Sequence, residues 1–192
     1  MTLLHNISRT LQRRRNSTWH ALGYDTTVRP ETPADYAAIA HLTHTAFNND
    51  AEANLIATLR CQAEDYIALV AEQHGAIAGH ILFSPASLDK APDCKIMALA
   101  PMAVSNVLQH QGIGSALVRA GLEQCYKQGI AAVVVLGHPD YYRRFGFTPA
   151  SRFNISCPWQ AADNAFMVLE LTPGALKGKS GKVVYHPAFA KL

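Results

Sequence analysis

The stretch QHQGIGSALVRAGLEQCYKQG, residues 109–129, contains two glycines at the start of a helical pattern. Gly112 directly precedes the pattern, Gly114 lies in its first turn, and the pattern ends before Gly129. The apolar face of that helix is formed by Ile113, Ala116, Leu117 and Ala120. The first N–H groups of a helix have no partner inside it and carry partial positive charge, and glycines leave them uncovered. The stretch therefore predicts a main-chain anion site that suits a phosphate, although the glycines alone fit an ordinary tight connection equally well.

Two other phosphate motifs do not fit the chain. The dinucleotide fingerprint GxGxxG needs a third glycine at position 117, where this sequence has Leu117. The run GALKGKS, residues 174–180, is one spacer residue short of a P-loop and leads into the strand-like GKVVY. We therefore expect neither a dinucleotide fold nor a P-loop.

Around this stretch, the pattern predicts alternating strands and helices. Residues 66–88 hold two apolar runs around His74-Gly75, which is a hairpin signal, and Pro101 interrupts the apolar strand 94–104. Further strands are predicted at 26–30, 130–137, 166–171 and 181–185, and helices at 33–47, 52–61 and 139–147. This order predicts an α/β fold in which helices cover a mixed sheet.

Composition narrows the class of protein. The chain has 192 residues, of which 49% are hydrophobic and 16% charged, and this suits one soluble globular domain. The net charge of +3 does not call for a nucleic-acid or anionic-membrane partner, and no apolar stretch approaches the roughly 20 residues of a membrane span. The four cysteines form no CxxC pair, so we expect free thiols, no metal and a cytoplasmic protein.

Residues 1–24 differ from the rest of the chain because they are rich in arginine, with Arg13, Arg14 and Arg15 in a run, and have no acidic residue. We expect a basic, disordered extension before a single domain at 25–192. An organellar transit peptide and a nucleic-acid-binding arm share this composition and are the alternatives.

Two motifs in a fixed order carry a resemblance to a known family. Gln109-x-x-Gly112-x-Gly114 matches the Gln/Arg-x-x-Gly-x-Gly/Ala signature of the GNAT N-acetyltransferases, and YYRRFGF, residues 141–147, is similar to that family's FYxxxGF segment. Over about residues 27–192 the chain is similar to the YhbS-type members of the family. The resemblance implies a GNAT fold, with a mixed central sheet of about seven strands, flanked by helices and splayed between strands 4 and 5.

The resemblance also implies acetyl-CoA as cosubstrate. Its pyrophosphate would bind the glycine turn, and its pantetheine arm would bind main-chain atoms of the fourth strand. The residues expected to bind acetyl-CoA are Met102, Ala103, Val104, Gln109, His110, Gln111, Gly112, Ile113, Gly114 and Ser115. Relatives carry an Asn ahead of the tyrosine helix that helps to fix the pantetheine arm, whereas VLGHPDYY, residues 135–142, has none.

For the chemistry, Tyr142 aligns with the tyrosine of the family segment and is the expected acid that protonates the departing CoA thiolate. A main-chain N–H near Ala103 or Val104 is the expected donor to the thioester oxygen. The residues that offer a general base are Asp93, Asp50, Glu52 and His138, each with a structural role as its alternative. A water channel without a dedicated base is also open.

Two other chemistries are not expected. No cysteine has an adjacent histidine, so a covalent acyl-cysteine route is disfavoured. His41 and His44 stand three apart on one predicted helix, but without further ligands we expect no metal.

Together these features predict an N-acetyltransferase that moves an acetyl group from acetyl-CoA to a primary amine by direct attack. The acceptor would be a small molecule or a peptide, no membrane is involved, and a homodimer is left open. The alternatives are a non-catalytic CoA-binding regulatory domain and a protein that binds nucleic acid through its basic arm.

Overall fold

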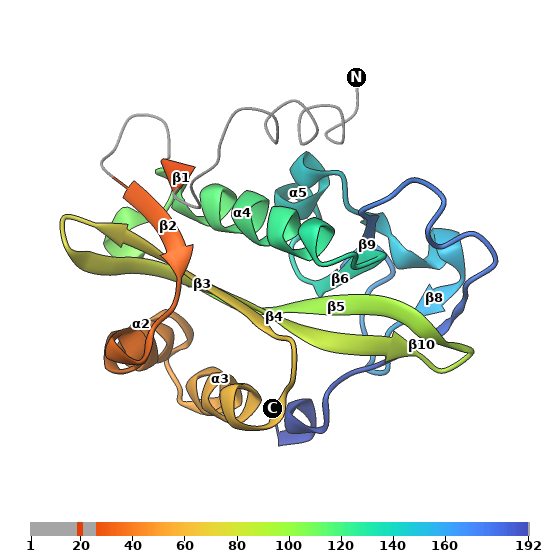
Figure 1. Ribbon diagram of the computed structural model, residues 1–192, viewed down its shortest axis with the longest axis horizontal. Helices are drawn as coiled ribbons and strands as arrows, with labels where there is room; N and C mark the ends of the chain where they lie inside the picture. Colours follow the sequence, from red (N-terminus) through yellow and green to blue (C-terminus); the bar gives the residue numbers. More distant parts are fainter. Residues whose placement is uncertain (1–18, 21–25, 192) are drawn as a thin grey trace. The chain divides into compact units, whose positions relative to one another are not determined.

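The computed structural model describes residues 19–20 and 26–191 (Figure 1). These residues form two compact units. The first, here the N-terminal unit, contains residues 19–20, 26–84, 100–121 and 186–191. The second, here the C-terminal unit, contains residues 85–99 and 122–185. The single domain predicted for residues 25–192 spans both, and the arginine run at 13–15 lies outside the described residues.

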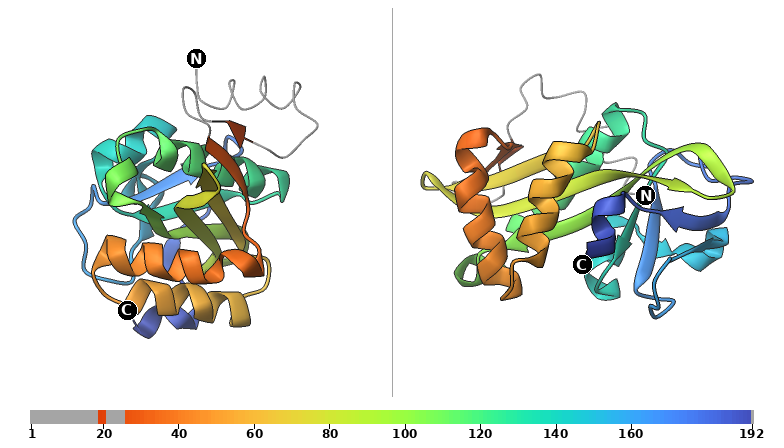
Figure 2. Two further views of the ribbon diagram at one scale, coloured as in Figure 1. Left: turned by 90° about the vertical axis from the view of Figure 1, so that its left-hand side faces the viewer. Right: turned by 90° about the horizontal axis from the view of Figure 1, so that it is seen from below.

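The N-terminal unit is built on antiparallel strands in the order β1, β2, β3 and β4. Helices α2 and α3 cover one face of these strands, and the first turns of α4 cover the other face (Figures 1 and 2). The 3-10 helix η5 packs against α3. The bounds are β1 Trp19–His20, β2 Thr26–Pro30, η1 Pro33–Asp35, α2 Tyr36–Phe47, α3 Ala51–Gln62, β3 Ile67–Gln73, β4 Ala76–Leu88, η2 Asn106–Leu108, α4 Ile113–Lys127 and η5 Pro187–Lys191.

The predicted hairpin is confirmed. Strands β3 and β4 pair from Gln73 opposite Ala76, and the two residues between them, His74 and Gly75, both have positive φ (52° and 77°). Two successive positive φ values define the type of turn whose twist matches a right-handed hairpin. Trp19 and His20, which fall in the stretch predicted as an extension, pair with β2 as a two-residue strand.

The C-terminal unit holds the rest of the sheet. β5 runs parallel to β6, β6 is antiparallel to β9, and β9 also pairs with β7. β10 pairs with the end of β4 and, in parallel, with β8. The bounds are β5 Ala91–Val104, β6 Ala132–Leu136, α5 Pro139–Tyr142, η3 Arg143–Phe145, β7 Thr148–Pro149, η4 Ala150–Phe153, β8 Ile155–Ser156, β9 Phe166–Glu170 and β10 Gly181–Val184.

The core of this unit follows from the β-branched run that the sequence places in β6. Val134 and Val168 face each other across the β6–β9 ladder, and both are buried. Helix α4 ends where Gly129 predicts. The N–H of Gly129 donates to Tyr126 O (3.0 Å), and the N–H of Ile130 donates to Cys125 O (3.1 Å). Gly129 has φ +72°, and this pair of bonds is the glycine-terminated helix end expected at that position.

The mixed sheet flanked by helices agrees with the predicted fold class. Within residues 19–20 and 26–191, seven strands have four or more residues (β2, β3, β4, β5, β6, β9 and β10), which matches the expected number. The three two-residue strands β1, β7 and β8 were not predicted, because two residues are too few to show a period.

One strand differs from its prediction. β5 is continuous from Ala91 to Val104 and begins three residues before the predicted 94. Pro101 was expected to mark a bulge or a splayed edge in place of a fully paired ladder, and the register of β5 and β6 covers only Ile96–Ala98 opposite Ala132–Val134. The ladder thus ends before Pro101, as a splay between these strands requires.

Among the described residues, no helix is long and apolar enough to cross a bilayer.

Candidate functional site

The glycine loop, residues 105–115, joins β5 to α4 within the N-terminal unit. It starts where the N–H of Ser105 donates to Ala78 O on β4 (2.9 Å), and η2 follows. The side chain of Gln109 donates to Asn106 Oδ1 (3.1 Å) and, at 3.5 Å, to Val104 O. Gln109 therefore holds the loop to the end of β5, which gives this predicted binding residue a structural task as well.

The loop enters α4 through two residues with positive φ, His110 (62°) and Gly112 (86°). The N–H of Ala116 donates to Gly112 O (2.9 Å), so the N–H groups of residues 113–115 precede the hydrogen-bond ladder of the helix. A Cβ built on Gly112 meets nothing within 4 Å among the described residues. The loop therefore presents main-chain donors at the positive end of a helix of 15 residues, with open space beside Gly112.

Gly114 differs from Gly112 in its backbone conformation. It is the second residue of α4, half-buried, and is absent from the positive-φ residues of the described chain. Its backbone would therefore accept other residue types, unlike that of Gly112.

The end of β5 alternates between buried and half-buried residues. Ala103 is buried, whereas Met102 and Val104 are half-buried. The predicted binding residues Met102–Val104 and Gln109–Ser115 are thus brought together in one segment of the N-terminal unit.

Tyr142 lies in the C-terminal unit, at the end of α5. This helix starts with Pro139, and the carbonyl of His138 accepts the N–H of Tyr142 (3.2 Å). The Tyr142 ring packs edge to face on Phe147, with centroids 5.6 Å apart, and a Cβ on Gly137 would approach its Cε2 to 2.6 Å. Tyr142 is 7% exposed, so the residue expected to act as the acid is also packed in the core.

Burial raises the pKa of Tyr142, with a smaller contribution from the neighbouring Tyr141. The phenol is therefore neutral and carries its proton throughout the ordinary pH range.

The carboxylates expected as bases have different surroundings. Asp93 is exposed on β5 in the C-terminal unit, and Asp50 is exposed and accepts a short contact (2.7 Å) from the Nδ1 of His44. Glu52, in the first turn of α3, has an Oε2 that is shielded from solvent and has no hydrogen-bond partner among the described residues. Of these three acids, Glu52 is the one with a buried oxygen that lacks a hydrogen-bond partner among the described residues.

The cysteines are free thiols. Burial raises the pKa of Cys94, Cys125 and Cys157, so these groups are thiols rather than nucleophilic thiolates. Within the part of the chain that is described, no group of three or more His, Cys, Asp or Glu could hold a metal ion.

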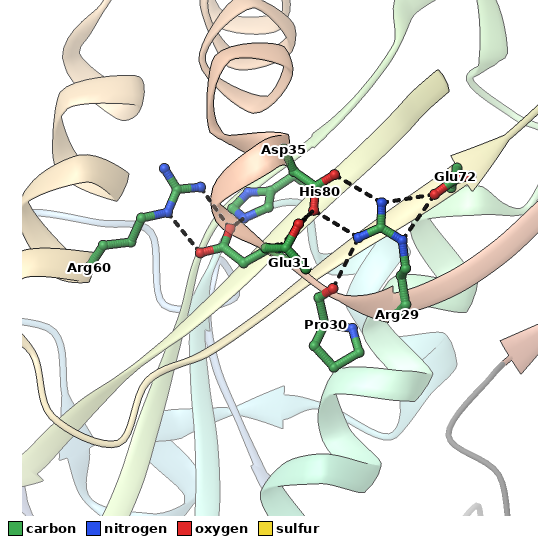
Figure 3. A network of polar contacts seen from close by, with 8 residues as sticks. Arg29, Pro30, Glu31, Asp35, Arg60, Glu72 and His80 are labelled. Atoms are coloured by element: carbon green, nitrogen blue, oxygen red, sulfur yellow. Dashed lines mark hydrogen bonds and ion pairs between the residues drawn. The ribbon is translucent and has the colours of Figure 1, made fainter. Parts of the chain in front are cut away.

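Sequence reasoning missed a set of charged side chains in the N-terminal unit, here the buried ionic network (Figure 3). The guanidinium of Arg60 donates two hydrogen bonds of 2.7 Å to Glu31, and the Nε2 of His80 contacts the same carboxylate at 2.9 Å. These side chains are 9%, 5% and 0% exposed, respectively. Arg60 also lies over the ring of Tyr36, 3.9 Å from its centroid.

A second part of the network centres on Arg29, which donates to both oxygens of Asp35 (2.7 and 2.9 Å) and to Glu72 (2.8 Å) (Figure 3). The Arg29 guanidinium holds the pKa of Asp35 well below its usual range. The main-chain N–H of Thr32 also donates to Asp35 Oδ2 (2.7 Å), so this carboxylate takes part in capping the N-terminus of η1 as well. No local signal predicts the contacts of Glu72 with Arg29 or of Glu31 with Arg60 and His80, because they join residues 29 to 49 apart.

The comparisons with known proteins agree with one another. The family model described as Acetyltransferase (GNAT) domain matches residues 64–149. The uncharacterized N-acetyltransferase YhbS of Escherichia coli K12 is 37% identical over 166 residues, which cover 86% of this chain and 99% of that protein. The chain belongs to the GNAT family of N-acetyltransferases.

Solved GNAT structures support the same assignment. The crystal structure of Escherichia coli YhbS in complex with CoA matches with a TM-score of 0.83 and 34% identity, and covers 91% of this chain and 97% of that one. A GNAT acetyltransferase from Brucella melitensis in complex with acetyl-CoA matches with a TM-score of 0.71 and 34% identity, and covers 86% and 99%. The predicted GNAT fold is confirmed, and this GNAT protein is an acyltransferase.

The region that matches the GNAT family model contains the candidate site but only part of the buried ionic network. Residues 64–149 include the glycine loop and Tyr142, as well as Glu72 and His80 of the network. Glu31 and Arg60 precede it, so the network joins the matched region to elements outside it.

Proposed function

We propose that this chain transfers the acetyl group of acetyl-CoA to a primary amine by direct attack of the amine on the thioester. The observation that carries the proposal is the start of α4, where residues 113–115 present main-chain N–H groups beyond the positive-φ Gly112. Such a helix start binds phosphate through its dipole and its free donors. Two relatives with 34% identity hold CoA or acetyl-CoA, which supports the same cosubstrate here.

The donor is proposed to bind along one continuous segment. The pyrophosphate contacts Gln111–Ser115, and Gln109 and His110 shape the loop that leads to it. The pantetheine arm runs along Met102, Ala103 and Val104. In support, the ladder between β5 and β6 spans only Ile96–Ala98 on β5, so Met102–Val104 lie beyond its end.

Three events complete the reaction as we propose it. The amine must be neutral to attack, although a free alkylamine has a pKa of about 10.4. Negative charge then develops on the thioester oxygen, and a main-chain N–H near Ala103 or Val104 stabilises it. Finally Tyr142 protonates the departing thiolate, whose free pKa is about 8.5.

The state of the thiols favours direct attack over an acyl-cysteine intermediate. Burial raises the pKa of Cys94, Cys125 and Cys157, and this disfavours the thiolate that a covalent route needs. The proton from the amine goes to Glu52, either directly or through water, because its Oε2 has no hydrogen-bond partner among the described residues. Asp50, Asp93 and His138 are the alternatives to be compared with Glu52.

The test of the proposed acid is Tyr142→Phe, with Tyr141→Phe as its control. Both changes remove one hydroxyl from the same aromatic cluster and keep the ring. We expect kcat to fall by about 10²-fold or more in Tyr142→Phe, with CoA affinity unchanged, because general acids contribute on that scale. Equal and small effects of the two changes would remove Tyr142 from the mechanism.

The acceptor class is tested with a panel of small amines, peptides with free amino termini and lysine-containing peptides, with free CoA release as the readout. Calorimetry with CoA on the same preparation tests donor binding separately. Absence of CoA binding would overturn the proposed function as a whole.

A further inference from the structure

Gly79 on β4 lies directly beneath the start of α4. A Cβ added there would be 2.9 Å from Leu117 Cδ1, 3.1 Å from Ile113 Cγ2 and 3.2 Å from the carbonyl oxygen of Ala103. Ile113 and Leu117 are one helical turn apart and both are buried, so they form the face through which α4 packs on the sheet. One missing methyl group thus lets the helix start and the end of β5 approach the same point of β4.

The neighbouring residue fixes the other end of the loop. The register of β3 and β4 shifts from Ala71 opposite Gly79 to Glu72 opposite Ile77, which leaves Ala78 as an extra, bulged residue. The carbonyl of Ala78 accepts the N–H of Ser105, the first residue of the glycine loop. Ala78 and Gly79 therefore contact the loop both where it leaves β5 and where it enters α4.

The backbone does not require glycine at position 79. Gly79 is not among the residues with positive φ, unlike Gly75 and Gly112. An alanine here would be conformationally ordinary, and its only cost is the contact with what lies above it. Leu117 Cδ1 is the end of a flexible side chain and can move, whereas the Ala103 carbonyl belongs to the main chain and can yield only if β5 moves.

We infer that Gly79 is a positioning residue for the acetyl-CoA site: it sets the distance between the strand end at Ala103 and the helix start at Ile113. This inference rests on the proposed function, in which the first segment binds the pantetheine arm and the second binds the pyrophosphate. A side chain at 79 separates the two segments by a few tenths of an ångström or more, so a ligand that spans both can no longer satisfy both at once.

The experiment compares Gly79→Ala and Gly79→Val with Gly121→Ala. Gly121 lies further along α4 and also packs on β4, where an added Cβ would approach the Phe83 ring carbon Cε2. Both sites therefore disturb the same helix–strand contact, but only Gly79 lies under the loop. Thermal unfolding, Kd for CoA by calorimetry, and KM for acetyl-CoA with kcat are measured for each variant.

We expect Gly79→Val to raise the Kd for CoA about tenfold or more, and Gly79→Ala to raise it about threefold, since small misplacements of binding groups have effects on this scale. KM for acetyl-CoA should rise in parallel, with a smaller change in kcat. Gly121→Ala should lower thermal stability and leave the Kd of the folded protein within about twofold.

A second change supplies the rescue. Leu117→Val shortens the side chain nearest to the added methyl, so Gly79→Ala combined with Leu117→Val should recover part of the lost CoA affinity. A non-additive result of this kind is expected only for groups in direct contact.

The possible outcomes distinguish a failure of this inference from a failure of the proposed function. If the wild-type chain binds no CoA, the proposed function fails, and the inference with it. If the wild type binds CoA and the Gly79 variants bind it equally well while losing thermal stability like Gly121→Ala, then Gly79 is only a packing residue and the inference is overturned.

Discussion

The glycine loop and the buried ionic network lie in the same unit but are built in opposite ways. The loop, residues 105–115, offers main-chain N–H groups and depends on backbone conformation at positions such as Gly112 (φ +86°). The network depends on side chains, with Glu31, Arg60 and His80 almost fully removed from solvent. The comparison teaches that the site proposed for ligand binding carries little side-chain charge, whereas the charges of this unit are used to join its elements.

The two regions should therefore fail differently when changed. Charges that are buried together stabilise only as a set, because removing one leaves the others desolvated and uncompensated. A main-chain site tolerates many side-chain changes and is sensitive to those that alter φ or fill the space above the N–H groups. Stability should report on the network, and cosubstrate affinity on the loop.

The largest expected effect is on stability, in Glu31→Gln. The change keeps the shape of the side chain but removes the negative charge that pairs with Arg60 and contacts the Nε2 of His80, so we expect a loss of about 3–5 kcal/mol in the free energy of unfolding. Urea denaturation at neutral pH measures this loss.

Affinity for CoA in the folded fraction of Glu31→Gln should stay within about twofold of the wild type, since Glu31 contacts no residue of the glycine loop among the contacts described above. A tenfold loss of affinity would mean that the network and the loop are coupled, and the comparison would have to be abandoned.

The next effect is on affinity, in Gly112→Ala, for which Gly75→Ala is a matched control. Both glycines have positive φ (86° and 77°), and at neither would a Cβ meet anything within 4 Å among the described residues. Each substitution should cost about 1–2 kcal/mol of stability from left-handed backbone strain. Only Gly112→Ala should also weaken CoA binding, by about tenfold, because it alone adds a side chain beside the helix start.

Calorimetry with CoA and thermal unfolding on both variants give the two quantities separately. Equal affinities in Gly112→Ala and Gly75→Ala would show that the space beside Gly112 is not used by the ligand.

The same contrast explains what the sequence could and could not predict. The glycine loop, its helix and the Gly129 terminus are encoded within about twenty neighbouring positions, where period and turn residues are directly visible. The network joins Glu31 to Arg60 and to His80 across separations of 29 and 49 residues, and nothing in a charged residue's neighbours says that it will be buried. Gly79 was missed for the same reason, since its role depends on Ile113 and Leu117 lying above it.

The β5 strand shows the limit within a single element. Pro101 was a correct signal of altered pairing, and the predicted end of the strand at 104 is also correct, but the sequence placed the start at 94 instead of Ala91 and did not show how short the ladder with β6 is. Tyr142 is a third case: the motif identifies the residue, while its 7% exposure and contact with Phe147 fit both a catalytic and a packing role. Only kinetics can divide the two.

A smaller effect is expected from pH. Burial lowers the pKa of His80 from its ordinary 6.5 and outweighs the opposing effect of Glu31. The unfolded chain then binds more protons than the folded one, so stability should fall as pH decreases below about 6.5, by up to about 1.4 kcal/mol per unit. The pKa of Glu31 is lowered as well, from 4.5, and its loss begins only below that value, so pH 7.5 to 5.5 isolates the histidine.

Urea denaturation at pH 7.5 and 5.5 measures this, on the wild type and on His80→Gln. The variant keeps a group that can hydrogen-bond Glu31 but cannot titrate, and it should lose about 1 kcal/mol less than the wild type over the interval. An identical loss in both proteins would mean that the pKa of His80 is the same in the folded and the unfolded chain. A smaller loss in the wild type than in His80→Gln would mean that the folded state holds His80 protonated, as a true ion triad requires.

The smallest expected effect is in Glu72→Gln, at the solvent side of the network. Glu72 is about one-third exposed, and Arg29 retains both bonds to Asp35 when Glu72 is neutralised. Screening by solvent reduces such a pair to roughly 0.2–1 kcal/mol, and raising the salt concentration should reduce it further. Comparing urea midpoints of the wild type and Glu72→Gln at low and high salt tests both statements. If this change costs as much as Glu31→Gln, the six side chains of the network act as one unit and burial is not what distinguishes its two halves. A small, salt-sensitive cost would show that the network contributes most to stability where Glu31 is shielded from water.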